Sequence, residues 1–535
     1  MEHDDELGPP PDEPPRHEDG RHIIRLPARR KDIVDATIAA LAELELFQRG
    51  GVLSDIVRDP EVGEGGIVLP DGEPRVRLTP YTRVDEMASI ACCFERKKKV
   101  GDHYDWSEVD APKNIVKTVM ERGEWPHIRP LDAMISWPVL RPDGTVFDGI
   151  GYDVRTRCYA TKAIGLNLKP CITPSDVTKA IALFDDILCD FPFERPEHKS
   201  AWLASLLTIL ARPAIRGPIP MLIVDASDRG SGKSLLCDLI GAILLGQRLP
   251  RRGIPANEEE MGKALLGIGI GCYPVVLLDN VTTTLRSAKL DMVLTGEIYQ
   301  DRVLGVNLEM KVPIKTQFIA SCNNASVSTD LIRRSLHCRI VANVERPEQR
   351  TGFKYQLPEA AQEPAMRKRL LEAAFTILVG YEQSGRERVT VRPIGSYEAW
   401  ASRIQSALVW AGLPDPVLTQ DELREQADTE GERLGPLLES WHAMFGDRPM
   451  LVKDALAQAR EEASPQFEAP NPKALDLLSA FESLMYEGKK PNSQTIGSRI
   501  RNWRDKWMNS MRFCQGPEAG GSRKWFVQKT KPDGG

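Results

Sequence analysis

Apolar residues recur at helical spacing in some segments of the chain, and in others they form the short runs typical of strands. Residues 31–46 (KDIVDATIAALAELEL) and 112–125 (PKNIVKTVMERGEW) carry the helical pattern, the second with a proline near its start. Residues 135–159 hold a Pro-Asp-Gly turn between two apolar runs, which predicts a β-hairpin. Two more helices are expected over residues 173–193 and 198–215. The first part of the chain is therefore predicted to be mixed α+β.

The middle of the chain alternates short apolar strands with helices. Residues 220–227 (PMLIVDAS) predict a strand that runs into a glycine-containing loop, and a helix with an apolar face starts at Lys233 (KSLLCDLIGAILLG). Residues 273–281 (YPVVLLDNV) and 316–324 (TQFIASCNN) are apolar runs that end in polar residues. This order is typical of an α/β domain with a parallel sheet, which presents groups to its ligand at the carboxyl ends of the strands.

The loop in residues 226–236 (ASDRGSGKSLL) follows the phosphate-loop pattern G-x-x-x-x-G-K-[ST], except that Ser227 replaces the first glycine. Serine is tolerable there, because phosphates are bound mainly by the later amides, the lysine and the hydroxyl. Lys233 would contact the terminal phosphates and Ser234 would ligate Mg²⁺. The alternative is that the G-S-G-K sequence occurs by chance. The candidate nucleotide-binding residues are Arg229, Gly230, Ser231, Gly232, Lys233, Ser234 and Leu235.

Polar residues at the other strand ends extend this candidate site. Asp279 can hold Mg²⁺ through water, and Asn323 could orient the attacking water. Arg333 and Arg334 precede a further apolar strand and could project into the site of a neighbouring subunit. The alternatives are an ordinary solvated aspartate, and that one of the two arginines is a surface or ion-pair residue. With Lys233 and Asn280, these residues form the candidate catalytic set.

The end of the chain is basic, whereas the remainder is acidic. Residues 487–535 contain eleven Lys/Arg and four Asp/Glu, a charge balance of +7. Since the net charge of the whole chain is −6, the other residues have a balance of −13. Three helices and a hairpin are expected after residue 449, an order that predicts a winged helix. Its charged side chains suit phosphate contacts, and the alternative is a winged helix that binds protein. The candidate DNA-binding residues here are Arg499, Arg501, Arg504, Lys506, Arg523 and Lys524.

Composition narrows the class of protein. The chain is 41% hydrophobic and 27% charged, with no apolar run of the roughly 18 residues that a membrane span needs, so no membrane partner is expected. The first 20 residues are acidic and proline-rich, unlike a signal peptide. The ten cysteines form no C-x-x-C pair, which favours reduced cysteines in a cytoplasmic protein. His337 is interpreted as a packed residue rather than a ligand.

These motifs in this order resemble the AAA+ ATPases of superfamily 3 helicase type, in particular phage- and plasmid-encoded replication helicases often fused to primases. The resemblance covers roughly residues 130–415 and is carried by LRPDGTVFDGIGYDVRTR, SDRGSGKSLL, VVLLDNV, TGEIYQDRVLG, FIASCNN and DLIRRSLHCRI. It implies an AAA+ core with a helical lid, and ATP and Mg²⁺ as cofactors. It also implies a hexameric ring that translocates on DNA, in which each site is completed by an arginine of the adjacent subunit.

A hairpin expected over residues 301–317 (DRVLGVNLEMKVPIKTQ) stands where such helicases carry a hairpin that points into the ring channel. Carried over, Lys311 is the candidate tip residue that grips the strand, with Arg302 and Lys315 nearby. The alternative is that these charges are solvated hairpin residues.

One position departs from the family pattern, and another could add a further contact to the nucleotide. Asn280 occupies the place where many AAA+ proteins carry a glutamate that activates water. An amide can position water but cannot accept its proton, which leaves Glu297 as a candidate base. In the predicted helical lid, Arg403 is either a second sensor of the nucleotide or a helix-surface residue.

The sequence therefore predicts an α/β protein with a P-loop AAA+ core, a parallel sheet and a helical lid, between a mixed α+β region and a winged helix. The predicted parts are a disordered leader (1–30), an α+β region for oligomerisation or for DNA or partner contact (31–170), a helical collar (171–215), the AAA+ core (216–350), a lid with connector (351–448) and the winged helix (449–535).

The predicted function is that of an ATP-dependent DNA helicase or translocase in the replication of a phage, plasmid or other mobile element. Single-stranded DNA would lie in the ring channel and duplex DNA at the winged helix. The N-terminal third shows no paired carboxylates with a histidine, so a primase would be a separate protein. The alternatives are a non-processive initiator or regulatory ATPase, and a nucleotide-binding defence module with weak hydrolysis.

Overall fold

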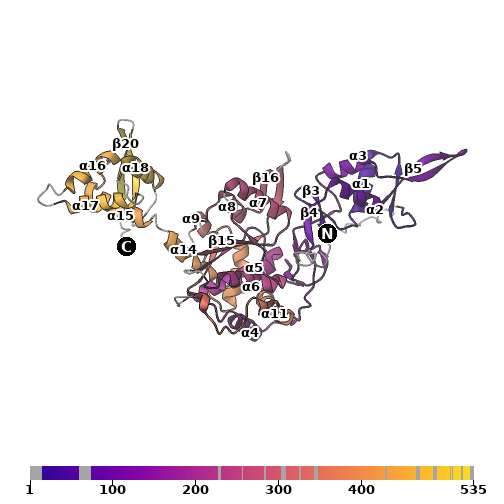
Figure 1. The fold of residues 1–535 in the computed structure, drawn as a ribbon, viewed down its shortest axis with the longest axis horizontal. Helices are drawn as coiled ribbons and strands as arrows, with labels where there is room; N and C mark the ends of the chain where they lie inside the picture. Colours follow the sequence, from indigo (N-terminus) through magenta and orange to yellow (C-terminus); the bar gives the residue numbers. More distant parts are fainter. Residues whose placement is uncertain are drawn as a thin grey trace, which may run out of the picture. The chain divides into compact units, whose positions relative to one another are not determined.

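The computed structural model forms two compact units, residues 1–423 and 424–535 (Figure 1). The sequence placed the last boundary at residue 449 instead. The division falls earlier because the helix Gly431–Phe445 packs into the core of the second unit. The described residues are 15–58, 74–226, 230–255, 257–281, 285–302, 309–323, 327–342, 347–427, 431–464, 470–485, 491–505, 508, 510–519 and 522–529.

The N-terminal region contains two small sheets and three helices around their own core. Residues 22–26, assigned by sequence to the disordered leader, form a strand because the alternate residues Ile24 and Leu26 are buried. The helix predicted over 31–46 ends at Leu41, and Leu46 starts a strand. The elements are β1 (His22–Leu26), α1 (Arg30–Leu41), β2 (Leu46–Arg49), β3 (Val52–Val57), β4 (Arg75–Leu78), α2 (Tyr81–Ala91), β5 (Cys92–Val100), β6 (His103–Val109), α3 (Lys113–Glu121) and β7 (Arg129–Pro130), in sheets of order β1-β5-β6 and β4-β3-β2-β7.

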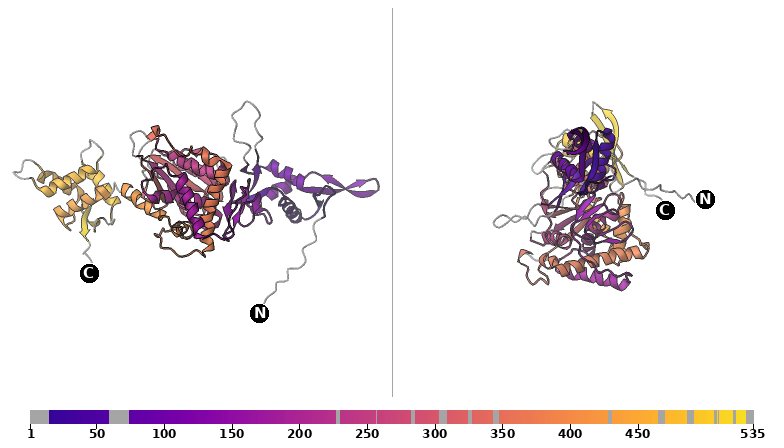
Figure 2. Two further views of the ribbon diagram at one scale, coloured as in Figure 1. Left: turned by 90° about the horizontal axis from the view of Figure 1, so that it is seen from below. Right: turned by 90° about the vertical axis from the view of Figure 1, so that its right-hand side faces the viewer.

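The strands β5 and β6 extend beyond this core as a long antiparallel ribbon (Figures 1 and 2). Its far end is exposed and basic at Lys97, Lys98 and Lys99. Trp106 lies under Arg25 and Lys97, whose charged groups are 4.8 and 5.3 Å from the ring centre. The ribbon therefore combines positive charge with an aromatic surface.

The hairpin predicted around the Pro-Asp-Gly turn is confirmed. β9 (Val139–Leu140) pairs antiparallel with β10 (Val146–Phe147), and Gly144 in the turn has φ of 82°. A second small sheet in this region has the order β11-β12-β8, from β8 (Ala133–Ile135), β11 (Gly151–Asp153) and β12 (Cys158–Ala160).

The predicted parallel sheet is present as five strands in the order β14-β15-β18-β13-β19, all parallel. Every residue of the inner strand β13 is buried, as expected where helices cover both faces of a sheet. The strands are β13 (Met221–Ala226), β14 (Arg251–Arg252), β15 (Val275–Val281), β18 (Gln317–Asn323) and β19 (Ser335–Ile340). Their polar ends therefore meet along one edge.

Helices and one hairpin surround this sheet. Trp202 donates a hydrogen bond from Nε1 to the carbonyl of Leu236 at 2.9 Å, which joins α5 to α6 in the largest core. The hairpin pairs β16 (Ile298–Arg302) with β17 (Glu309–Pro313). The helices are α4 (Pro174–Ile187), α5 (Pro196–Ala211), α6 (Lys233–Leu245), α7 (Glu258–Ile270), α8 (Ala288–Thr295), α9 (Thr329–Ile332), α10 (Glu359–Gln362), α11 (Pro364–Gln383), α12 (Glu398–Trp400), α13 (Ser406–Trp410) and α14 (Gln420–Ala427), with a π-helical turn at 401–405.

One buried arginine joins the N-terminal region to this hairpin. Arg49, 6% exposed at the end of β2, donates hydrogen bonds to the carbonyls of Gly269, Leu131, Asp132 and Pro313 at 2.5–2.9 Å. We refer to these contacts as the Arg49 clamp. Three segments that are distant in sequence therefore accept hydrogen bonds from one guanidinium group.

The second unit has three helices followed by an antiparallel hairpin, after the helix α15 (Gly431–Phe445). Trp441, Phe481 and Phe513 stack edge to face in its core. The elements are α16 (Val452–Glu462), α17 (Pro472–Ser483), α18 (Ser493–Asn502), β20 (Met511–Ala519) and β21 (Ser522–Lys529). Within the described residues of both units, no helix is long and apolar enough to cross a bilayer.

Candidate functional site

The described end of the loop before α6, residues 230–232, has a backbone that suits an anion site. Gly230 and Gly232 have φ of 77° and 103°, left-handed values that glycine adopts without strain. Gly232 caps α6, and no described side chain caps the helix at this end. The amides of the first helical turn therefore point toward the place where an anion would bind. Ser231 is buried and Ser234 is exposed, whereas the predicted residue Arg229, like Ser227, lies outside the described residues.

Three strand ends bring polar groups to this loop. Ala226 of β13 lies opposite Asn323 of β18 in the sheet, and the Lys233 Nζ atom donates a hydrogen bond to Asn323 Oδ1 at 2.5 Å. Ser321 of β18 donates a hydrogen bond from Oγ to Oδ1 of Asp279, on the next strand β15, at 2.5 Å. The structure thus places Lys233, Asp279 and Asn323 along one edge of the sheet.

Asn280 follows Asp279 in an unusual backbone conformation. Its φ is 56°, where the sheet register between β15 and β18 is irregular, and its backbone N–H donates to Ser321 Oγ at 2.9 Å. Asparagine tolerates left-handed backbone better than most residues. The amide side chain is consequently exposed at the sheet edge.

The sequence analysis missed an arginine that faces Asp279. Arg251 Nε lies 3.4 Å from Asp279 Oδ2, and Arg251 Nη2 lies 2.9 Å from Asp238 Oδ2. Burial raises the pKa of the Asp238 carboxyl, and Arg251 opposes this shift. The three residues come from β14, β15 and α6, so no local motif could have indicated their contact.

Arg333 and Arg334 lie at the opposite end of the sheet from this edge. The carbonyl of Arg334 accepts a hydrogen bond from the amide of Met221, the first residue of β13, at 3.0 Å. Arg334 is only 14% exposed and pairs with Asp291 at 2.6 Å, whereas Arg333 is 62% exposed. Neither arginine can therefore reach Lys233 of its own chain.

Two other predicted residues, Arg403 and Glu297, contact residues outside the candidate site. Arg403, considered as a second sensor, is buried and pairs with Glu382 at 3.0 Å. Glu297, considered as the base, lies beside Gly217, where an added Cβ would be 3.6 Å from its carboxylate. Gly217 precedes β13, so the Glu297 carboxylate lies away from the loop that follows that strand. Glu297 is therefore not placed to act as the base at this loop, whereas the sensor role of Arg403 stays a prediction.

The hairpin residues are spread along the hairpin rather than gathered at its tip. Lys311 pairs with Gln300 in the middle of the hairpin, and its side chain is exposed, so its prediction as the tip residue is wrong. The turn itself, residues 303–308, lies outside the described residues. Arg302 is exposed at the end of β16, and Lys315 follows β17 and pairs with Asp132 at 2.7 Å.

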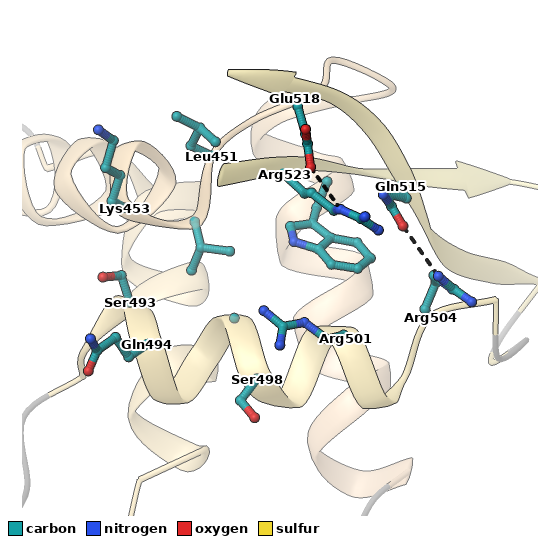
Figure 3. A pocket seen from close by; sticks show the side chains of 13 residues that line it. Leu451, Lys453, Ser493, Gln494, Ser498, Arg501, Arg504, Gln515, Glu518 and Arg523 are labelled. Atoms are coloured by element: carbon teal, nitrogen blue, oxygen red, sulfur yellow. Dashed lines mark hydrogen bonds and ion pairs between the residues drawn. The ribbon is translucent and has the colours of Figure 1, made fainter. Parts of the chain in front are cut away.

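The second unit contains a groove of about 780 Å³ between α18, the hairpin and the start of α16 (Figure 3). Arg501, Arg504 and Arg523 line it, together with Lys453, which the sequence analysis did not single out. Arg504 bonds to Gln515 and Arg523 to Glu518, as the dashed lines in Figure 3 show. The other predicted DNA-binding residues are placed differently: Arg499 and Lys524 do not line the groove, and Lys506 lies outside the described residues.

Comparisons with known proteins give weak similarities. No protein-family model and no curated protein matches the chain. The A-form apo structure of the NrS-1 C-terminal region is similar at 11% identity and a TM-score of 0.36, over 88% of this chain and 95% of that one. The X-ray structure of JCV helicase is similar at 14% identity and a TM-score of 0.20, over 45% of this chain and 67% of that one. At such scores, the functional assignment depends on the geometry of the chain itself.

Proposed function

We propose that the chain is an ATP-dependent DNA translocase or helicase that acts as a ring oligomer in the replication of a mobile element. The observation that carries this proposal is the edge where Lys233 bonds to Asn323 beside Asp279. An open helix N-terminus, a lysine, a carboxylate and an amide at the ends of adjacent parallel strands are the groups that phosphoryl transfer requires. In this proposal, residues 216–350 are a P-loop AAA+ core.

The residues at this edge fit a Mg²⁺-bound nucleoside triphosphate. The first-turn amides of α6 and the Lys233 ammonium would bind the phosphates, and the exposed Ser234 hydroxyl and the Asp279 carboxylate would hold the ion. When bound, Mg²⁺ neutralises charge that develops on the phosphate oxygens. Lys233 would leave Asn323 for the phosphates, which frees the Asn323 amide to orient water.

Arg333 supports assembly into a ring. It is exposed at the end of the sheet opposite its own loop, so it could complete only the site of another subunit. The pair of Arg333 with Asp330 is exposed and can be exchanged, whereas Arg334 is mostly buried and pairs with Asp291. We therefore assign the role in trans to Arg333 and a structural role to Arg334.

DNA would contact the chain at two places. The exposed residues Arg302 and Lys311 would face single-stranded DNA on the hairpin, and the groove arginines of the second unit would contact duplex phosphates. In this proposal the second unit is a winged helix, with α18 as the recognition helix.

One observation favours a second candidate function, a slow nucleotide-dependent switch that loads partners without unwinding DNA. Asn280 exposes an amide where a base would be needed, and an amide cannot accept the proton of water. Displacement of one strand from a forked DNA substrate with ATP separates the two functions. The helicase should release the strand, whereas the switch should bind nucleotide and DNA without releasing it.

The test of the site itself is ATP turnover by Lys233→Ala. We expect loss of hydrolysis with retained folding, because the lysine neutralises the phosphates. Lys263→Ala is the matched control, since Lys263 is partly exposed on α7 and pairs with Glu259 and Glu260 there. Turnover by Lys233→Ala at the wild-type rate would show that the site is assigned wrongly.

The role of Arg333 in trans is tested by mixing subunits. Arg333→Ala should abolish hydrolysis but keep nucleotide binding, and mixtures with Lys233→Ala subunits should recover part of the activity. Recovery is expected because an intact loop can then meet an intact arginine. Mixtures that stay inactive would exclude a role in trans.

A further inference from the structure

Two histidines and a glutamate meet inside the first unit, away from the phosphate-binding edge. His198 lies in the first turns of α5, His337 in β19 and Glu422 in α14, and both imidazoles are 0% exposed. Glu422 Oε2 is 2.9 Å from His198 Nε2 and 3.7 Å from His337 Nδ1. One ligand atom of each residue lies within 4.8 Å of the other two.

Hydrogen bonds on the far sides of both rings determine which nitrogens carry protons. His198 Nδ1 lies 2.9 Å from the backbone carbonyl oxygen of His337, which can only accept. His337 Nε2 lies 3.4 Å from a carboxylate oxygen of Asp225, which also only accepts. Neutral rings in these bonds are protonated at His198 Nδ1 and His337 Nε2. Their other nitrogens, His198 Nε2 and His337 Nδ1, then present lone pairs.

Three lone pairs therefore converge on one buried point. Among the described residues, His198 Nε2, His337 Nδ1 and Glu422 Oε2 have no hydrogen-bond partner. Acceptors that face each other in a buried site repel unless a positive charge lies between them. A single proton would bridge only two of these three acceptors and leave the third unpaired, whereas a metal ion accepts all three lone pairs at once.

We propose that His198, His337 and Glu422 bind a divalent transition-metal ion, with Zn²⁺ as the best match. Two imidazole nitrogens and one carboxylate oxygen form a zinc ligand set, and bonds of about 2.0–2.2 Å place ligand atoms roughly 3–4 Å apart. The separations of 2.9 and 3.7 Å at Glu422 are close to this range. The fourth position would be filled by Glu194, whose Oε2 lies 3.8 Å from His198 Nε2, or by solvent.

The groups around this set orient it as metal sites require. The two bonds that fix the imidazole tautomers come from a backbone carbonyl and from Asp225, and Arg195 pairs with the second oxygen of Glu422. Metal-binding histidines almost always donate their other N–H to such a carbonyl or carboxylate. The site thus contains the ligand atoms and also the hydrogen-bond partners that fix the orientation of the ligand side chains.

The ion would act structurally. It would join α5, β19 and the first turn of α14, three elements that are far apart in the sequence. Asp225 belongs to β13, the strand that leads into the phosphate loop, and it pairs with Arg339 at 2.7 Å on the next strand. The metal would therefore hold α14 against the strand beside the one that carries that loop.

The test uses the full chain without an affinity tag, since tags bind metals. After dialysis against micromolar Zn²⁺ and then metal-free buffer, we expect one zinc per chain by mass spectrometry, and a higher melting temperature than after EDTA. Co²⁺ substitution should give the visible bands of a four-coordinate site. His198→Gln and Glu422→Gln should lose the zinc, the Co²⁺ bands and the EDTA-sensitive increase.

Glu43→Gln is the matched control. Glu43 Oε1 lies 2.9 Å from His22 Nε2, the same separation as in the proposed site, but no third ligand side chain of the described residues joins this pair. This variant should keep the zinc, and circular dichroism checks that all variants are folded. Absence of stoichiometric zinc in the wild-type chain, or zinc retained by folded Glu422→Gln, would overturn the proposal and leave a plain hydrogen-bonded His–Glu pair.

Discussion

Loss of the arginines that line the groove of the second unit should change how strongly the affinity for duplex DNA depends on salt concentration. Replacing Arg501, Arg504 and Arg523 together by alanine removes three of the positive charges that line it. Each phosphate contact contributes about 0.9 to the slope of log affinity against log salt, so the loss should be about 2.7. Over a fourfold rise in salt, the duplex affinity of the wild-type chain should then fall about 40-fold more than that of the variant.

The contacts of these arginines within the chain do not change this expectation. Arg504 pairs with Asp505 and Arg523 with Glu518, both at 3.2 Å and with about half of each side chain exposed. Such exposed pairs contribute at most about 1 kcal/mol, so a phosphate can replace the carboxylate.

The assay is fluorescence anisotropy of a labelled duplex without nucleotide, at several salt concentrations. Arg499→Ala serves as the control, because Arg499 is on the same helix as Arg501 but does not line the groove. Its slope should stay near the wild-type value. An unchanged slope in the triple variant, or equal losses in Arg499→Ala and Arg501→Ala, would refute the groove as a DNA site.

Three predictions concern stability, each measured by thermal or urea unfolding. Arg334→Ala should cost about 3 kcal/mol, because it leaves the mostly buried Asp291 carboxylate, 18% exposed, without its partner; a melting temperature like the wild type would contradict this. Gly241→Ala should cost about 1–3 kcal/mol, since its Cβ would lie 2.6 Å from a backbone nitrogen, whereas Gly267→Ala, with no atom within 4 Å, should cost nothing. Arg49→Lys should cost about 1–3 kcal/mol, because an ammonium cannot satisfy four carbonyls; equal stability would show that the clamp is unimportant.

The parts of the fold that the sequence predicted are those specified by local patterns. The apolar runs that became β13, β15 and β18 end at Ala226, Val281 and Asn323, and parallel pairing alone then brings their polar ends together. The glycine-containing loop before α6, the Pro-Asp-Gly hairpin and the three helices before the last hairpin are likewise contained in short segments. The sequence could therefore indicate most of the candidate nucleotide edge.

Contacts between distant segments could not be predicted in this way. Arg251 on β14 contacts Asp279 on the neighbouring strand β15, and His198, His337 and Glu422 are scattered over more than two hundred positions of the chain. From the sequence alone, His337 is interpreted as a packed residue, because its contacts with His198 and Glu422 follow no sequence spacing. Arg403 likewise pairs with Glu382 of another helix, a contact that helical periodicity alone does not reveal.

The Arg49 clamp has a mechanical consequence for any motion of the β16–β17 hairpin. The guanidinium bonds to the carbonyl of Pro313 at the end of β17, and a Cβ on the next residue, Gly50, would lie only 2.4 Å from the carbonyl oxygen of Lys311. Hydrogen bonds weaken steeply when their geometry is disturbed, so the root of the hairpin cannot slide while β2 stays fixed. A force that displaces the hairpin is therefore transmitted through Arg49 to the sheet β4-β3-β2-β7 of the N-terminal region.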